Sequence, residues 1–266
     1  MKVILEENDL CFLAASYLKK RLQINCGKMV LALPTGSTFE NFYKYLVGFY
    51  KAGQISFKDV ITFNLDEYIG LSATSPQSYR YYMNKRFFDY VDVKRENIHF
   101  PDTGNDDYQK ACKDYEEQIT SAGGIDLMFG GLGRNGHIAF NESGTPFDMP
   151  SHRVELAAST RKANARFFNG DIEAVPYYAL TVGMSTILKA EEIIILAGGE
   201  SKAEAVYHAV QCPITTAWPV SALREHKNSF IVADAKALSL VSKNVLEEFS
   251  NCSLGQNCLM RKSETK

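Results

Sequence analysis

Two adjacent carboxylates at the end of an apolar run are the first residues suited to acid–base chemistry. Asp66 and Glu67 directly follow Val60–Leu65, a run typical of a buried strand. Because neighbouring residues of a strand face opposite sides, we expect the two acids to have different roles, one of them as a general base. The alternative is a charge pair that caps the next segment.

A histidine in a glycine-rich segment is the second candidate. His137 lies within Gly130–Glu142, which follows the apolar run Ile125–Phe129. An imidazole gains and loses a proton near neutral pH, and Glu142 is close enough in sequence to orient it. The remaining histidines have no such neighbour, and we interpret them as structural: His99, His152, His208 and His226.

The glycines of this segment also fit a dinucleotide-binding pattern. Gly131, Gly133 and Gly136 match GxGxxG, and Glu155 follows at the distance of a ribose-binding acid. That motif has to open a helix, but the prolines at positions 146 and 150 prevent a long helix here. The glycines instead indicate a backbone that passes close to a ligand.

A hydroxyl-rich turn between a predicted strand and a predicted helix is suited to an anion. It follows Met29–Leu33, precedes a helix from about Phe39, and consists of Pro34, Thr35, Gly36, Ser37 and Thr38. Backbone N–H groups and the dipole at a helix N-terminus favour a phosphate there. The Walker pattern GxxxxGK[ST] is absent, and a plain capped turn is the alternative.

Strand-like and helix-like segments alternate along the chain, which predicts one α/β domain with a mostly parallel sheet. Continuous apolar runs typical of strands buried on both faces are 29–33, 60–65, 125–129, 179–182, 193–197 and 230–233. Predicted helices are 9–22, 75–90 opened by Ser75-Pro76, 106–120, 201–210 and 243–249. We expect a single domain over residues 1–250 and a polar C-terminal tail over 251–266.

The composition excludes several classes of partner. Lys plus Arg number 29 and Asp plus Glu 31, and the net charge of −2 gives no electrostatic reason to expect a nucleic acid or an anionic membrane. No apolar run is long enough for a transmembrane helix, and acidic residues follow the N-terminus too soon for a signal peptide. The six cysteines form no CxxC pair, so we expect free thiols, a cytoplasmic location and no metal site.

Six motifs in order along residues 1 to about 235 closely resemble the glucosamine-6-phosphate deaminase, or isomerase, family. They are Leu33–Thr38 (LPTGST), Thr62–Tyr68 (TFNLDEY), Gly136–Glu142 (GHIAFNE), Ala163–Phe168 (ANARFF), Ala179–Gly183 (ALTVG) and Ala217–Ser221 (AWPVS). The resemblance implies a Rossmann-like α/β domain with helices on both faces of the sheet. It also implies cofactor-free conversion of glucosamine 6-phosphate and water to fructose 6-phosphate and ammonia.

The same resemblance implies roles for individual residues. Asp66 corresponds to the base that moves a proton between C2 and C1, and His137 to the group that opens the sugar ring, with Asn135 and Glu142 completing its network. The phosphate is expected on the turn Thr35–Thr38, with cationic partners Arg166 and Lys202. Arg161 is the alternative arginine, and Glu67 is the second candidate for the base.

The sequence leaves three other functions open. The protein could be a phosphogluconolactonase, an inactive sugar-phosphate sensor, or an enzyme that acts on galactosamine 6-phosphate. Where many family members have Pro, this chain has Ser143, and the stretch to Glu155 lacks the paired arginines and the lysine that bind a phosphorylated activator in hexameric members. We therefore expect a monomer or small homo-oligomer that acts on a small sugar phosphate without this activation.

Overall fold

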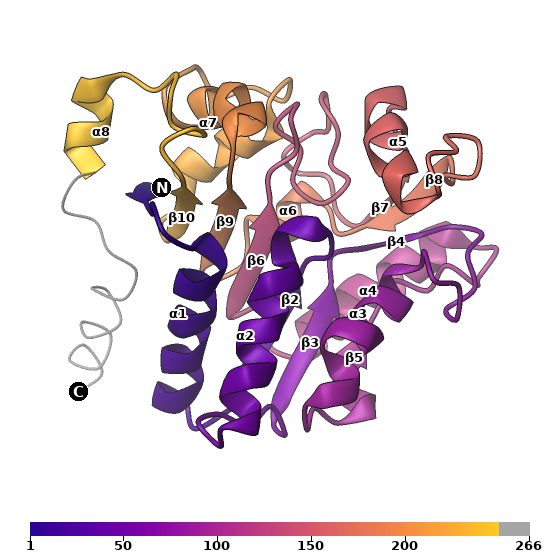
Figure 1. Ribbon diagram of the computed structural model, residues 1–266. Coiled ribbons are helices and arrows are strands. Elements are labelled where there is room, and N and C mark those ends of the chain that lie inside the picture. Colours follow the sequence, from indigo (N-terminus) through magenta and orange to yellow (C-terminus); the bar gives the residue numbers. More distant parts are fainter. Residues whose placement is uncertain (250–266) are drawn as a thin grey trace.

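Seven parallel strands form the central sheet, in the order β1–β10–β9–β6–β2–β3–β5 (Figure 1). Their bounds are β1 Lys2–Leu5, β2 Met29–Leu33, β3 Val60–Asn64, β5 Ile98–His99, β6 Leu127–Gly131, β9 Ile193–Ala197 and β10 Ser229–Ala233. The computed structural model describes residues 1–249, so the predicted tail, 251–266, lies outside the described residues. Five of the predicted apolar runs fall on these strands, and the predicted parallel sheet is confirmed.

Helices cover both faces of this sheet (Figure 1), because alternate strand residues enter two separate cores. In β2, Leu31 enters the core beneath three helices, α1 (Leu10–Ile24), α2 (Glu40–Lys51) and α3 (Tyr79–Arg86). Its neighbour Ala32 enters the opposite core, with α4 (Tyr108–Ser121), α6 (Met184–Ile187) and α7 (Ala203–Val210). The Rossmann-like fold with helices on both faces is therefore confirmed, and α5 (Ala158–Asn164) and α8 (Lys243–Phe249) complete the helices.

A second, three-stranded antiparallel sheet stands beyond the carboxyl ends of the central strands. Its order is β4–β8–β7, with bounds β4 Asp66–Tyr68, β8 Tyr178–Thr181 and β7 His152–Glu155. The run 179–182 therefore does form a strand, but in this small sheet and not in the central one. Tyr68, Phe140 and Phe168 join a separate small core beside it.

The predicted helix over 75–90 is wrong at both ends. The helix begins at Tyr79, because Ser78 and not Ser75 is the N-cap and accepts a hydrogen bond from the Tyr81 N–H at 3.1 Å. It ends at Arg86, and a short 3₁₀ turn, Phe88–Tyr90, follows. No prediction was made for the short strands β1, β4, β5 and β7, which carry too few residues for a visible apolar pattern.

The chain order of the strands creates a crevice between β2 and β6. From β2 the chain proceeds to β3 and β5 on one side, whereas from β6 it proceeds to β9 and β10 on the other. The loops that follow β2 and β6 therefore diverge, and ligands of such sheets bind where this happens. The turn Pro34–Thr38 and the segment around His137 are these two loops.

Two findings bear on the expected environment. Among the described residues, Cys11, Cys26, Cys112 and Cys212 are free thiols, whereas Cys252 and Cys258 lie outside the described part. Within residues 1–249, none of the helices is both long and apolar enough to span a bilayer.

Candidate active site

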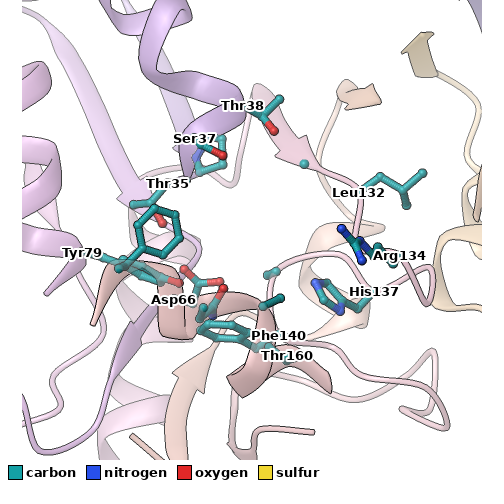
Figure 2. Close-up of a pocket in the computed structure, with 18 of the residues that line it drawn as sticks. Thr35, Ser37, Thr38, Asp66, Tyr79, Leu132, Arg134, His137, Phe140 and Thr160 are labelled. Atoms are coloured by element: carbon teal, nitrogen blue, oxygen red, sulfur yellow. The ribbon is translucent and has the colours of Figure 1, made fainter. Parts of the chain in front are cut away.

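A cavity of about 1190 Å³ opens at the carboxyl ends of the central strands. Its wall includes nearly every predicted site residue: Thr35, Gly36, Ser37, Thr38, Asp66, Asn135, His137, Arg166 and Lys202. Glu142 is the exception, because it lies behind His137 and contacts its ring. Figure 2 shows Asp66 and His137 pointing into the same space, with the turn that carries Thr35, Ser37 and Thr38 at another side.

The adjacent acids Asp66 and Glu67 point in different directions, as their strand setting predicts. Asp66 lines the cavity and is 7% exposed. Glu67 faces away and accepts hydrogen bonds of 2.9 Å from the N–H groups of Tyr79 and Arg80, the first two residues of α3, and from its neighbour Tyr68. Glu67 therefore binds the start of the next helix, as one interpretation of the sequence expected, whereas the role of Asp66 as a general base stays a prediction.

The environment of Asp66 favours its protonated form. Burial, followed by the negative charge of Glu67, raises the pKa of Asp66 to about 8. Among the described residues, no hydrogen-bond donor contacts its carboxyl group to offset this. A carboxyl with such a pKa ionises near the physiological range and is a much stronger base than a solvated one once it is ionised.

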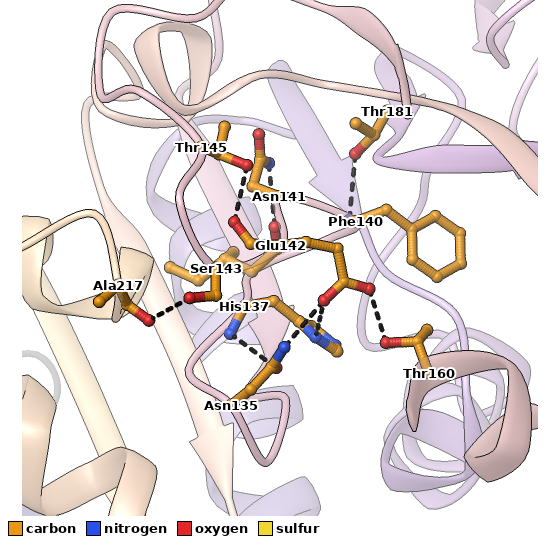
Figure 3. Close-up of polar contacts among 11 residues, drawn as sticks. Asn135, His137, Phe140, Asn141, Glu142, Ser143, Thr145, Thr160, Thr181 and Ala217 are labelled. Atoms are coloured by element: carbon orange, nitrogen blue, oxygen red, sulfur yellow. Dashed lines mark hydrogen bonds and ion pairs between the residues drawn. The ribbon is translucent and has the colours of Figure 1, made fainter. Parts of the chain in front are cut away.

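His137 is held by a network that Glu142 organises (Figure 3). Oε2 of Glu142 lies 3.5 Å from Nδ1 of His137, an ion-pair contact that is too long for a good hydrogen bond. Asn135 donates to the same oxygen at 2.8 Å, and Thr160 donates to Oε1 at 2.6 Å. Burial alone would raise the pKa of Glu142, but His137, Thr160 and Asn135 together outweigh it and lower this pKa to about 2.

The loop that carries His137 is fixed from behind by buried polar groups. The Nδ2 group of Asn141 donates to the carbonyls of Ile138 at 3.0 Å and Val182 at 2.8 Å. Thr181, at the end of β8, accepts a hydrogen bond from the Phe140 N–H at 3.1 Å. The small sheet therefore holds this loop in place, and no helix forms over 132–151, as the prolines predicted.

Two of the glycines lie so close to neighbouring side chains that a Cβ atom would not fit. A Cβ atom on Gly133 would lie 2.4 Å from the His137 ring, and one on Gly136 would lie 2.7 Å from Trp218. Gly136 also has a φ of 76°, which favours glycine. The glycines thus make room for the histidine and the tryptophan, and not for a dinucleotide.

The turn after β2 has the geometry expected of an anion site. Gly36 has a φ of 99°, and its carbonyl accepts a 2.7 Å hydrogen bond from the Tyr82 hydroxyl of α3. The 3₁₀ turn Ser37–Phe39 then leads into α2. Arg166 reaches this turn from the segment after α5 and donates to the Ser37 hydroxyl at 3.3 Å.

Lys202 approaches from the loop after β9, whose geometry is set by Asp234. Asp234 accepts a 2.7 Å hydrogen bond from the N–H of Gly199, which has a φ of 84°. Burial lowers the pKa of Lys202, and the charges of Arg134 and Arg166 lower it further. The two predicted cations therefore do converge, and a third, Arg134, lies close by; its position in a glycine turn carries no sequence signal.

Arg161, the alternative to Arg166, does not line the cavity, and neither do the four other histidines. Arg161 is buried away from the cavity, where its guanidinium donates to the carbonyls of Val175 at 3.2 Å and Ile172 at 2.7 Å. Of the five histidines, only His137 lines the cavity. Across residues 1–249, no group of His, Cys, Asp and Glu side chains is arranged to hold a metal ion.

Comparison with known proteins decides the family. The family model described as glucosamine-6-phosphate isomerases/6-phosphogluconolactonase matches residues 6–232. The chain belongs to this family. The predicted resemblance is therefore confirmed over most of the chain.

Three similar members of the family are named or described as glucosamine-6-phosphate deaminases. A protein named glucosamine-6-phosphate deaminase from Fusobacterium nucleatum is 49% identical over 79% of this chain and 77% of its own length. One of the same name from Thermoanaerobacter sp. is 44% identical over 93% of this chain and 98% of its own. A solved structure described as a monomeric glucosamine-6-phosphate deaminase is 40% identical, covers 90% of this chain and all of its own, and superimposes with a TM-score of 0.83.

Substitution of Gly133 by Ala tests the packing around the imidazole. We expect Gly133→Ala to fold but to lose at least tenfold in turnover, because the new methyl group displaces the His137 ring, and misplaced catalytic groups lose about this much or more. Gly130→Ala in β6 is the matched control, since its methyl group meets only the ends of aliphatic side chains, at 2.8 Å from Ile195, 3.3 Å from Met128 and 3.7 Å from Ile138. Thermal unfolding and initial rates of both variants check this. Equal rates for the two would contradict a constrained ring.

Proposed function

We propose that this protein converts glucosamine 6-phosphate and water to fructose 6-phosphate and ammonia, with Asp66 as the proton-transfer base and His137 as the ring-opening group. The observation that carries the proposal is the arrangement of the cavity. A buried carboxyl and an imidazole line the same cavity as the hydroxyl-rich turn Thr35–Thr38 and the cations Arg166 and Lys202. A hexose phosphate held by its phosphate can therefore present its sugar to the carboxyl and the imidazole.

Ring opening is assigned to His137 because it needs an acid and a base at neighbouring oxygens. The imidazole takes the proton of the C1 hydroxyl and returns a proton to the ring oxygen, so the C1–O5 bond breaks and an aldehyde forms. Glu142 holds the ring in place, through the 3.5 Å contact to Nδ1. Its low pKa keeps it ionised, so it stabilises the imidazolium form during this exchange.

Isomerisation is assigned to Asp66. Its carboxylate takes the proton from C2 of the open chain while a proton passes from the ammonium group to O1, which gives a neutral enolamine. The protonated Asp66 then returns its proton at C1, which leaves a protonated imine at C2. Water adds to that imine carbon, and ammonia departs as the ketone forms. A carboxylate performs the proton transfer without a covalent intermediate, and the ammonium group of the bound substrate favours the ionised form of Asp66.

The lactonase activity included in the family description is the less favoured alternative. Lactone hydrolysis removes no proton from carbon, so it gives no use to a buried carboxyl whose pKa is raised to about 8. The relatives at 44–49% identity are named deaminases. An inactive sensor is disfavoured because nothing requires it to keep Asp66 buried at this cost.

Asp66→Asn tests the base directly. The amide keeps the shape of the site but cannot accept the C2 proton, so we expect ammonia release to fall at least about a hundredfold, the lower end of the usual range for a general base. Phosphate binding should change little, because the substitution leaves the turn Thr35–Thr38 and the cations Arg166 and Lys202 unchanged. Retention of more than a tenth of the wild-type rate would contradict this assignment, and Glu67→Gln is the next variant to compare.

The pH dependence tests the proposed environment of Asp66. Because Asp66 must be ionised, kcat/KM should rise with pH through the pKa of about 8 in the free enzyme. Glu67→Gln keeps an oxygen for the N-terminus of α3 but removes the negative charge, which lowers the pKa of Asp66 and moves the acid limb to lower pH. Comparing the two enzymes on one substrate cancels the titration of the substrate amine. An unmoved limb would show that Glu67 does not influence the base.

We also propose that the enzyme acts without activation by N-acetylglucosamine 6-phosphate. In the stretch 143–155 the paired arginines are reduced to Arg153, and its guanidinium lies 3.8 Å from the centre of the Tyr178 ring. The nearby acids Asp148 and Glu155 would repel a phosphate. The similarity to a structure described as monomeric agrees with a small assembly.

Substrate titrations with and without millimolar N-acetylglucosamine 6-phosphate test this second proposal. We expect hyperbolic curves whose half-saturation does not fall when the compound is added. Unphosphorylated N-acetylglucosamine at the same concentration is the control, and sedimentation gives the assembly state. A sigmoidal curve that the phosphorylated compound makes hyperbolic would refute the proposal.

A further inference from the structure

Arg134 is a cation in the cavity wall that none of the roles assigned so far includes. It lines the cavity, and among the described residues no carboxylate or hydrogen-bond partner engages its guanidinium. Figure 2 shows its side chain near His137, directed toward the open space. An arginine with no protein partner at the wall of a cavity is available to a ligand.

The turn that carries Arg134 directs the side chains of Arg134 and Asn135 to opposite sides of the loop. The Gly136 N–H donates to the carbonyl of Gly133 at 3.1 Å, which closes a turn with Arg134 and Asn135 at its two central positions. Asn135 points back to Glu142 and supports the histidine network. Arg134 is thereby left to face the cavity.

The strand order places Arg134 between the two loops already proposed to hold phosphate. β6 is hydrogen-bonded to β2 on one side and to β9 on the other. The loop after β2 is the turn Thr35–Thr38, and the loop after β9 carries Lys202. The loop after β6 therefore emerges in the middle of this row, and its cation is Arg134.

Electrostatics agrees with this placement. Burial lowers the pKa of Lys202, and the charges of Arg134 and then Arg166 lower it further, with no acidic group raising it. Three cations are therefore held near one another without a compensating carboxylate. A dianion is the ligand chemistry that relieves such a cluster.

We propose that Arg134 is a third phosphate-binding cation, which recognises the 6-phosphate together with Lys202 and Arg166 and selects phosphorylated over unphosphorylated amino sugars. The proposal rests on the proposed function for the identity of the sugar, but not for the presence of an anion site. Arg134 is a binding and specificity residue in this scheme.

The first test is the affinity for inorganic phosphate, which does not depend on turnover. We expect Arg134→Ala to weaken phosphate binding in calorimetry by roughly 10-fold to 100-fold, the range for a charge-assisted hydrogen bond. Arg134→Lys should recover part of this loss. Arg95→Ala removes one positive charge from the exposed surface and should leave the affinity unchanged. Binding by Arg134→Ala as tight as wild type would overturn the proposal.

The second test uses catalysis and pH. With glucosamine 6-phosphate, Arg134→Ala should raise KM by a similar factor while kcat stays within about threefold, since the contact is the same in ground and transition states. The pKa of Lys202 should rise when a neighbouring charge is removed, so the alkaline limb of the 1/KM profile should move to higher pH. A fall in kcat with unchanged KM and phosphate affinity would place Arg134 on the reacting sugar and overturn the proposal.

The two tests also separate this proposal from the proposed function. If the wild-type protein releases no ammonia from glucosamine 6-phosphate, the proposed function fails, and the phosphate titrations of wild type and Arg134→Ala still decide the role of Arg134. If ammonia is released but Arg134→Ala binds phosphate normally, the function stands and the third cation fails.

Discussion

Burying two adjacent carboxyl groups at one strand end is the constraint on which the rest of the site depends. Two such groups cannot both be ionised without cost, since burial and mutual repulsion each oppose charge. Glu67 is stabilised by three backbone N–H groups, two of them at the start of α3. Burial raises the pKa of both groups, but the backbone donors offset part of this rise for Glu67. Asp66 has no comparable donor among the described residues, and its pKa is raised to about 8.

The stabilisation of Glu67 also builds the wall of the cavity. By accepting from the first N–H groups of α3, Glu67 fixes where that helix begins relative to β4. Tyr79 and Tyr82 are thereby placed in the cavity wall, and Tyr82 holds the carbonyl of Gly36 in the predicted phosphate turn. One capping interaction therefore connects the proposed base, the helix beside it and the anion site.

The sequence was a good guide where burial dictates residue type. Strands covered on both faces must be continuously apolar, so β2, β9 and β10 could be recognised directly. β4 could not be recognised in this way, because its sequence, Asp-Glu-Tyr, begins with two acidic residues. The start of α3 was misplaced because both Ser75 and Ser78 suit an N-cap, and the contact that fixes the helix start, from Glu67 twelve positions before Tyr79, has no local sequence pattern.

Several candidate site residues could be predicted because each follows a strand, but the cationic residues could not be predicted from position alone. Asp66, His137 and the turn Thr35–Thr38 each follow a strand, and parallel strands bring their carboxyl ends to one edge. Choosing Arg166 over Arg161 needed the family motif, since nothing in the spacing shows that Arg161 binds carbonyls beneath the surface. Arg134 had no signal at all, because only the pairing of β6 with both β2 and β9 gives its position a meaning.

Burial shifts the pKa values of two cavity groups away from their charged forms, and a ligand would shift both back. Burial and the charge of Glu67 raise the pKa of Asp66, and a substrate ammonium lowers it again. Burial and the charges of Arg134 and Arg166 lower the pKa of Lys202, and a phosphate dianion raises it again. In the proposed reaction the same molecule carries both charges. The substrate therefore shifts both groups toward the charged forms that its own conversion requires, whereas an unphosphorylated or unaminated sugar shifts only one of them.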